Sequence, residues 1–248
     1  MKEKQKFRRV YVWQLPIRFF HWLNVLALTF LIISGLIIAN PPAFLIKADV
    51  SEIYWMGTTR FIHFTAAYLF LLVMIMRLYW AFAGNRFARW TAFMPFNKKV
   101  WENIKHVLKI DVLLMNEKVH DPKQVSIGHN SVATISYIVM FILALVMIFT
   151  GFGMYSATSE WLLPNLFSWV VPMLGSDFAA RQIHHIAMWF FIFFSMVHVY
   201  LVFYHDWLEG TGQASSMISG YKFIGSDQLK SKKDLTNNKT AEIQSNNN

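Results

Sequence analysis

Four long apolar stretches decide what this chain can fold into. They run from Phe19 to Ile38, Ile62 to Phe82, Val132 to Tyr155 and Ile183 to Tyr204. Each holds the roughly 20 apolar residues that an α-helix needs to cross about 30 Å of bilayer hydrocarbon. Because hydrocarbon offers the backbone no hydrogen-bond partners, the predicted fold class is all-α, a bundle of four transmembrane helices.

Composition and charge agree with a membrane protein. Of the 248 residues, 55% are hydrophobic and only 15% are charged, which lies outside the range typical of soluble domains. The net charge of +9 comes from basic residues beside the apolar stretches. Since they form no continuous stripe, they indicate contact with membrane lipid and not with nucleic acid. The first stretch is too long for a signal peptide and lacks a clear cleavage site, so we expect it to be retained.

The basic residues also predict the orientation. Lys and Arg cluster at the N-terminus, in the loop between the second and third stretches, and in the tail, whereas the other two loops hold only Lys47, Arg60 and Arg181. Both termini and the middle loop are therefore predicted to be cytoplasmic. In the middle loop, residues 100–115 have the apolar spacing of a helix lying on the membrane surface. On the opposite side, residues 161–174 are apolar but contain two prolines, which suits an interfacial cap or a docking surface.

The chain divides into a membrane domain, residues 1–224, and a polar tail, residues 225–248, whose composition is typical of disorder. It contains no cysteine. This excludes disulfides, covalent c-type haem attachment and thiolate-held iron-sulfur clusters within the chain, and it leaves the redox compartment open.

Five of the nine histidines lie in the apolar stretches, and all but His185, which points about 100° away from His184, sort into two depths. His184 and His198 are separated by 14 residues, which places them about 21 Å apart on nearly the same helix face. In the predicted orientation, His63 lies with His184 near the outer surface, and His21 lies with His198 near the cytoplasmic surface. We call His63 and His184 the outer pair, and His21 and His198 the inner pair. Because an unpartnered imidazole in hydrocarbon is costly, we expect each pair to bind something.

Two facing neutral imidazoles form the ligand set of six-coordinate haem iron, and helix bundles commonly hold such cofactors in their interior. The sequence therefore predicts two b-type haems, one bound by His63 and His184 and the other by His21 and His198. The alternative role for an intramembrane histidine is a hydrogen bond between helices. That role would explain a single histidine, but it explains four histidines in two pairs at matched depths less well. Zinc is disfavoured because no carboxylate accompanies either pair.

Small and basic residues at the same depths support two haems. Gly35 lies 14 residues beyond His21, at the outer level, where a porphyrin requires the backbone to come close; Gly151 and Gly153 reach the same depth. Arg77 lies 14 residues beyond His63, at the inner level, where its guanidinium can pair with a haem propionate. The alternatives are close-packing glycines and an arginine that contacts lipid phosphate.

Several motifs carry a family resemblance. They are RFFHWLN from Arg18, the run IHFTAAYLFLLVMIMRLYWAFAGNR from Ile62, GHN from Gly128, HHIAMW from His184, HVY from His198 and SMISGYK ending at Lys222. Together they resemble the b-type cytochrome subunit of membrane-bound nickel-iron hydrogenases, a group related to the membrane subunits of respiratory formate dehydrogenases. The resemblance extends to about residue 225.

The resemblance implies a multi-pass protein of the bacterial inner membrane whose haem ligands are His21, His63, His184 and His198. It implies hydrogenase large and small subunits as periplasmic partners, which pass electrons to the outer haem. The inner haem would then reduce a quinone, either menaquinone or ubiquinone, near the cytoplasmic face. The chain has no thiol, no metal-activated water and no nucleophile constellation of its own, which favours electron transfer over bond-breaking and leaves its status as an enzyme uncertain.

A quinone needs hydrogen-bonding groups near the inner haem. The candidates are Tyr200, just beyond His198, and His129 and Asn130, just before the third stretch. Each has an alternative, since Asn130 is suited to cap a helix, Tyr200 to lie in an interfacial aromatic belt and His129 to be solvated. Two other functions stay open: the equivalent subunit of a formate dehydrogenase or related oxidoreductase, and a haem-free membrane anchor.

Overall fold

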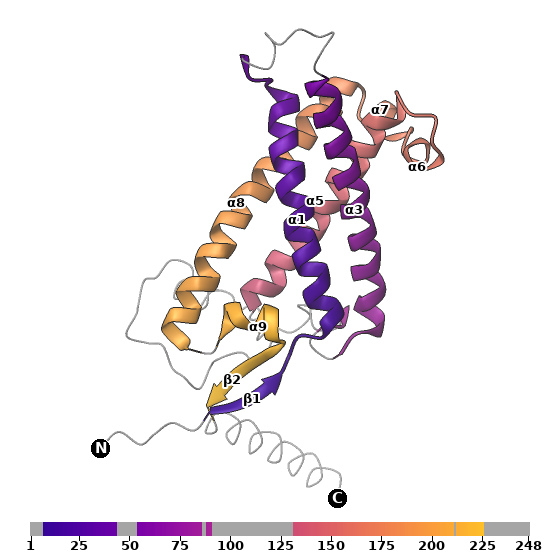
Figure 1. The fold of residues 1–248 in the computed structure, drawn as a ribbon. Coiled ribbons are helices and arrows are strands. Elements are labelled where there is room, and N and C mark those ends of the chain that lie inside the picture. The colour runs from indigo at the N-terminus through magenta and orange to yellow at the C-terminus, as the bar shows by residue number, and fades with distance from the viewer. Residues whose placement is uncertain (1–6, 44–53, 86–87, 91–130, 211, 226–248) are drawn as a thin grey trace, which may run out of the picture. The chain divides into compact units, whose positions relative to one another are not determined.

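The computed structural model describes residues 7–43, 54–85, 88–90, 131–210 and 212–225 (Figure 1). Four helices in this part are long and apolar enough to cross a membrane. They are α1 (Leu15–Ala39), α3 (Trp55–Ala83), α5 (Ser131–Ser156) and α8 (Asp177–Glu209). Each contains one predicted apolar stretch in full, so the prediction of four spanning helices is confirmed.

The chain forms two compact units. The four-helix unit comprises residues 19–83 and 135–198, and the terminal unit comprises residues 1–18, 84–134 and 199–248. The four-helix unit holds all four predicted haem ligands. The terminal unit holds the ends of the chain and the residues that follow α3.

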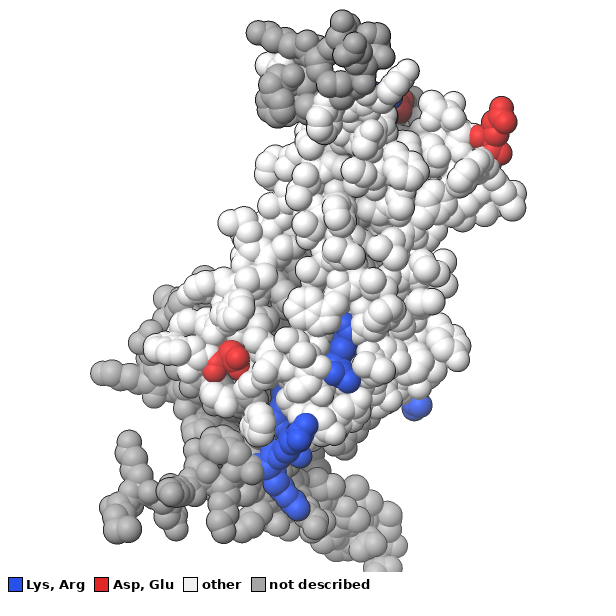
Figure 2. Space-filling view, viewed as in Figure 1, with Lys and Arg blue, Asp and Glu red and all other residues white. Residues whose placement is uncertain are grey.

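All four helices contribute to the core of the four-helix unit. Its buried cluster consists of Ala27, Phe70, Ala144, Ile148, Phe152 and Phe191. Alanine allows neighbouring helices to come close, and the phenylalanines fill the space between them. In the most apolar part of each helix, only 11% to 22% of the residues are buried. Most apolar side chains therefore face outward, and Figure 2 shows a surface on which charged side chains are sparse. A bilayer is the solvent that such a surface requires.

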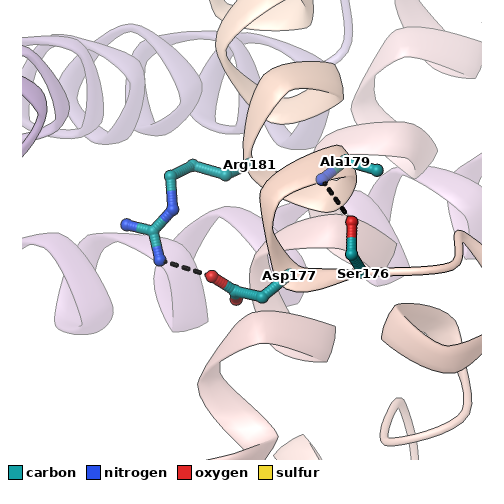
Figure 3. A network of polar contacts seen from close by, with 4 residues as sticks. All are labelled: Ser176, Asp177, Ala179 and Arg181. Atoms are coloured by element: carbon teal, nitrogen blue, oxygen red, sulfur yellow. Dashed lines mark hydrogen bonds and ion pairs between the residues drawn. The ribbon is translucent and has the colours of Figure 1, made fainter.

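Helix α8 begins at a well-defined cap. Gly175 has a φ of 88°, and the Oγ of Ser176 accepts a hydrogen bond of 3.1 Å from the backbone N–H of Ala179 (Figure 3). One turn further on, Arg181 forms an ion pair of 2.7 Å with Asp177. Both charged side chains are more than half exposed, so the pair contributes little, about 0.3–0.5 kcal/mol. The hydroxyl cap fixes where the helix starts.

Between α5 and α8 the chain forms two short helices, α6 (Leu162–Asn165) and α7 (Val170–Met173). This segment is broken, as its prolines predict. A Cβ added at Gly153 would lie 3.0 Å from the Cβ of Val170. Gly153 therefore allows α7 to pack closely on α5, which is the close-packing alternative for this glycine.

The terminal unit corrects the all-α prediction. Strand β1 (Phe7–Tyr11) pairs with β2 (Tyr221–Gly225) in an antiparallel ribbon, in which Tyr11 lies opposite Tyr221. Helix α9 (Gln213–Ser219) leads into β2 through Gly220, whose φ is 85°. A Cβ at Gly220 would lie 2.7 Å from Cε2 of Tyr11, so only glycine fits there without a shift. The sequence prediction missed the ribbon because the strands are short and far apart in the chain.

Lys222 is a further departure from expectation. By sequence it is a basic residue just before the polar tail, yet only 4% of the residue is exposed. Its Nζ donates a hydrogen bond of 3.3 Å to the Oε1 of Gln213 and lies 5.7 Å from the ring centre of Trp13. The aliphatic stem of a lysine can be buried in this way while its ammonium keeps polar and aromatic contacts. The predicted surface helix, residues 100–115, and the predicted disordered tail beyond residue 225 lie outside the described residues.

Candidate functional site

The two histidines of the outer pair each contact a hydroxyl from a neighbouring helix. Nδ1 of His63, on α3, lies 2.9 Å from the Oγ of Ser34 on α1. Nδ1 of His184, on α8, lies 2.9 Å from the Oγ1 of Thr150 on α5. Ser34 and Thr150 are both buried. All four spanning helices therefore supply a polar side chain to the outer level.

A glycine follows each of these hydroxyl residues. A Cβ at Gly35 would lie 3.4 Å from Cε1 of His63, and a Cβ at Gly151 would lie 3.1 Å from Cε1 of His184. The missing side chains allow each imidazole to lie against the backbone of the adjacent helix. The structure thus brings Gly35 to the outer level, next to the ring of a predicted ligand. Met188, one turn beyond His184, also reaches Gly35, with its Sδ 3.7 Å from the added Cβ.

The inner pair brings α1 and α8 together. The ring centres of His21 and His198 lie 6.5 Å apart, with an angle of 54° between the planes. Metal–imidazole bonds are about 2 Å long and a ring centre lies about 1 Å behind its nitrogen, so two imidazoles on one iron have centres about 6 Å apart. The observed spacing therefore fits an iron ion between the two rings.

Orphaned polar atoms at the inner level also fit a bound group. Within the described part of the chain, Nδ1 of His21 and Oδ1 of Asn24 are buried and have no hydrogen-bond partner. The two residues lie one turn apart on α1. Buried polar atoms nearly always have partners, and those without one often belong to sites that bind a ligand. Asn24 is a residue that the sequence prediction did not single out.

Arg77 lies on α3 with its guanidinium carbon 5.0 Å from the ring centre of Tyr137 on α5. This is a cation–π contact, which holds the charged group beside an aromatic face. Tyr137 could not be predicted as a partner, because a tyrosine near the start of an apolar helix is usually interfacial.

Tyr200 lies two residues beyond His198 on α8, in the terminal unit. Two residues correspond to about 200° around a helix axis, so the two side chains leave α8 on different faces. The Tyr200 residue is 53% exposed, and its ring stacks on Tyr204 at 5.9 Å. His129 and Asn130 lie outside the described residues.

The sequence prediction did not single out Ser34 and Thr150, which contact the predicted ligands His63 and His184. Hydroxyl residues are common in membrane helices, where they bond to their own backbone, so neither residue stands out alone. The available signal is the pair of dipeptides Ser34-Gly35 and Thr150-Gly151, which occur at the outer depth of the first and third stretches.

Comparison with known proteins identifies the family. Residues 12–220 match the family model of prokaryotic cytochrome b561. A relative from Rhizobium leguminosarum bv. viciae is 35% identical over 221 residues, covering 87% of this chain and 89% of the relative. One from Cupriavidus necator is 34% identical over 220 residues, covering 87% of both chains. Both bear the name probable Ni/Fe-hydrogenase B-type cytochrome subunit.

A relative from Escherichia coli K12, named probable Ni/Fe-hydrogenase 1 B-type cytochrome subunit, is 31% identical over 218 residues, covering 86% of this chain and 90% of the relative. The resemblance predicted from the sequence motifs is therefore confirmed. Four apolar helices and this family together indicate a multi-pass protein of the bacterial inner membrane. The chain belongs to the prokaryotic cytochrome b561 family.

Proposed function

We propose that this chain is a di-haem cytochrome b that carries electrons from a periplasmic nickel-iron hydrogenase to quinone. The observation that carries the proposal is the 6.5 Å spacing of the His21 and His198 rings inside the helix bundle. The family assignment and the printed names of the relatives support the hydrogenase as the electron source.

The ligands come from three helices. His21 of α1 and His198 of α8 hold the inner haem, while His63 of α3 and His184 of α8 hold the outer one. Haem b, when bound, supplies one-electron oxidation and reduction. With two histidines as ligands, the iron would have no open position, which disfavours oxygen binding. The surrounding apolar side chains exclude water, and Arg77 is placed by the proposal beside a propionate of the inner haem.

The direction of transfer follows from the predicted orientation. The outer pair faces the periplasmic hydrogenase small subunit, which joins the chain to the large subunit. The inner pair faces the cytoplasmic side, where both termini lie and where a quinone is reduced, whether menaquinone or ubiquinone. Tyr200, His129 and Asn130 are the proposed quinone-contacting residues, since each can hydrogen-bond a carbonyl.

The names of the relatives favour a hydrogenase over a formate dehydrogenase as the partner. A haem-free anchor is disfavoured by the 6.5 Å spacing of the His21 and His198 rings, which an iron ion between them would account for. An anchor that only tethers an enzyme has no need for buried imidazoles at two depths.

The test uses the full chain purified from membranes with the subunits that it retains. We expect two haem b per chain from the pyridine haemochrome spectrum, and both haems should be reduced when hydrogen is added. Nickel in the purified complex would identify the partner as a hydrogenase. A complex that contains nickel but no haem would leave only the anchor, and a haem-containing complex without nickel would point to a different oxidoreductase. His185→Ala is the matched control, because it removes a histidine next to a proposed ligand.

A further inference from the structure

We propose that Ser34 and Thr150 are positioning residues that fix the tautomer of the outer histidines and hold the outer haem at a lower reduction potential than the inner one. This inference rests on the di-haem function proposed above. It concerns only residues of this chain, which lie in the described part of α1, α3, α5 and α8.

The hydrogen of each hydroxyl is already engaged. The hydroxyl of Ser34 donates to the carbonyl of Phe30 at 2.5 Å, and that of Thr150 donates to the carbonyl of Val146 at 2.6 Å. A hydroxyl has one hydrogen and two lone pairs. Toward the imidazole each oxygen therefore accepts, and Nδ1 of the histidine is the donor.

The tautomer follows from this assignment. A neutral imidazole carries one N–H, so a histidine that donates from Nδ1 presents a lone pair at Nε2. His63 and His184 are thus both arranged to bind a metal through Nε2. A hydrogen bond at the second ring nitrogen also orients the ring and makes the ligand more basic.

The surroundings of the inner pair are different. Of the residues described, none provides a hydrogen-bond partner for Nδ1 of His21. The ring of His198 instead stacks on Phe194, with ring centres 5.5 Å apart and an angle of 13°. A more basic ligand stabilises the more positive, oxidised iron, so the outer haem should have the lower potential. One electron shared between the two haems then favours the inner haem, and inward transfer is downhill.

The glycines complete the arrangement. Gly35 and Gly151 each follow the hydroxyl residue and leave the imidazole room against the helix backbone, at 3.4 Å and 3.1 Å from an added Cβ. A hydroxyl residue followed by a glycine thus forms one contact site for an imidazole ring, and such a site occurs on α1 and on α5. Two equivalent contact sites at one level suit two ligands of one cofactor.

The test compares Ser34→Ala and Thr150→Val with the unaltered complex by potentiometric titration and low-spin electron paramagnetic resonance. In each variant we expect the outer haem to shift upward in potential and to change its g values, while the inner haem is unchanged. Loss of one hydrogen bond corresponds to about a fivefold change in the relative stability of the two oxidation states. That is about 40 mV, at 59 mV per tenfold for one electron.

Conservative swaps and a control separate this effect from a general disturbance. Ser34→Thr and Thr150→Ser keep the hydroxyl and should keep the potential. Thr29→Val removes a hydroxyl of the same helix that donates to the carbonyl of Val25, and it should change neither haem. If a hydroxyl-free variant loses the outer haem while the matching swap keeps it, the positioning role is supported.

An outer haem whose potential and g values stay unchanged in both hydroxyl-free variants would overturn the inference, although the di-haem function would stand. Loss of the outer haem in the conservative swaps as well would also overturn it. If the unaltered chain binds no haem, the proposed function itself fails, which is a separate result.

Discussion

The outer and inner histidine pairs use the same residue type in different surroundings. Each outer histidine contacts a buried hydroxyl and lies against a glycine backbone. The inner histidines lie among aromatic rings, with Trp22 beside His21 at 5.3 Å and Phe194 stacked on His198. If each pair binds a haem as proposed, identical ligands would give two haems of different potential, because the groups behind the ligands tune the iron. The proposal thus assigns the direction of electron flow to residues that contact the ligands and do not bind the metal themselves.

Removal of a ligand should separate the pairs most clearly. We expect His63→Ala or His184→Ala to lower the haem content from two to one and to stop reduction of the remaining haem by hydrogen. His21→Ala or His198→Ala should also lose one haem, but the haem that remains should still be reduced. Haemochrome spectra and hydrogen-driven reduction measure both effects. Full haem content in all four variants would disprove the ligand assignment.

The glycines should give the next largest effect, confined to the outer pair. Gly151→Ala forces a contact at 3.1 Å with the ring of His184, whereas Gly35→Ala forces one at 3.4 Å with His63. Overpacking of this kind costs about 1–3 kcal/mol, so we expect Gly151→Ala to release the outer haem at a lower temperature than Gly35→Ala. Thermal release of haem can be followed by absorbance.

Gly57→Ala is the control for these substitutions, because its added Cβ would meet only the Cβ of Tyr54, at 3.8 Å. It should leave both haems as stable as before. If Gly57→Ala releases the outer haem as readily as Gly151→Ala does, the contact with His184 is not the cause.

Arg77 should affect the inner pair alone. If its guanidinium pairs with a propionate of the inner haem, Arg77→Gln removes a positive charge that favours the reduced iron. We expect the inner haem to fall in potential by roughly 59 mV, which is a tenfold change for one electron. Redox titration checks this, and Arg181→Gln, which breaks an exposed ion pair, should shift neither haem. If the potential of the outer haem shifts instead, the prediction that Arg77 lies beside the inner haem is wrong.

Tyr200 should give the smallest effect. Tyr200→Phe removes one hydroxyl and is expected to slow quinone reduction about fivefold, the loss typical of one hydrogen bond. Dye reduction by the hydrogenase should persist, because the dye takes electrons before they reach the quinone. Equal loss of both rates would indicate failed assembly, and no loss of either would favour the aromatic-belt alternative for this tyrosine.

Much of the four-helix unit was predictable because its signals are long and local. An apolar stretch of about 20 residues in a bilayer can satisfy its own backbone hydrogen bonds only as a helix, so the helices follow from hydropathy alone. Helical periodicity then places His184 and His198 on one face. The sequence could predict that His21 and His198 lie at the same depth. It could not predict the distance between their rings, because that distance depends on how each helix is rotated about its axis.

The hydroxyl contacts and the ribbon could not be predicted in the same way. Ser34 and Thr150 bond to their own helix as many membrane hydroxyls do, so their second contact depends on how helices rotate about their axes. Strands β1 and β2 are five residues each and pair across more than 200 positions. The burial of Lys222 could not be predicted because a basic residue gives no local sign that a fold will bury it.

The ribbon has a consequence for the number of membrane crossings. Strand β1 precedes the first spanning helix and β2 follows the last, and the two are joined by backbone hydrogen bonds. Strands on opposite faces of a bilayer cannot pair, so the polypeptide between them must traverse it an even number of times. An odd number of crossings would place β1 and β2 on opposite sides of the membrane, where they could not pair. The pairing of these two strands therefore limits the topology to an even number of crossings.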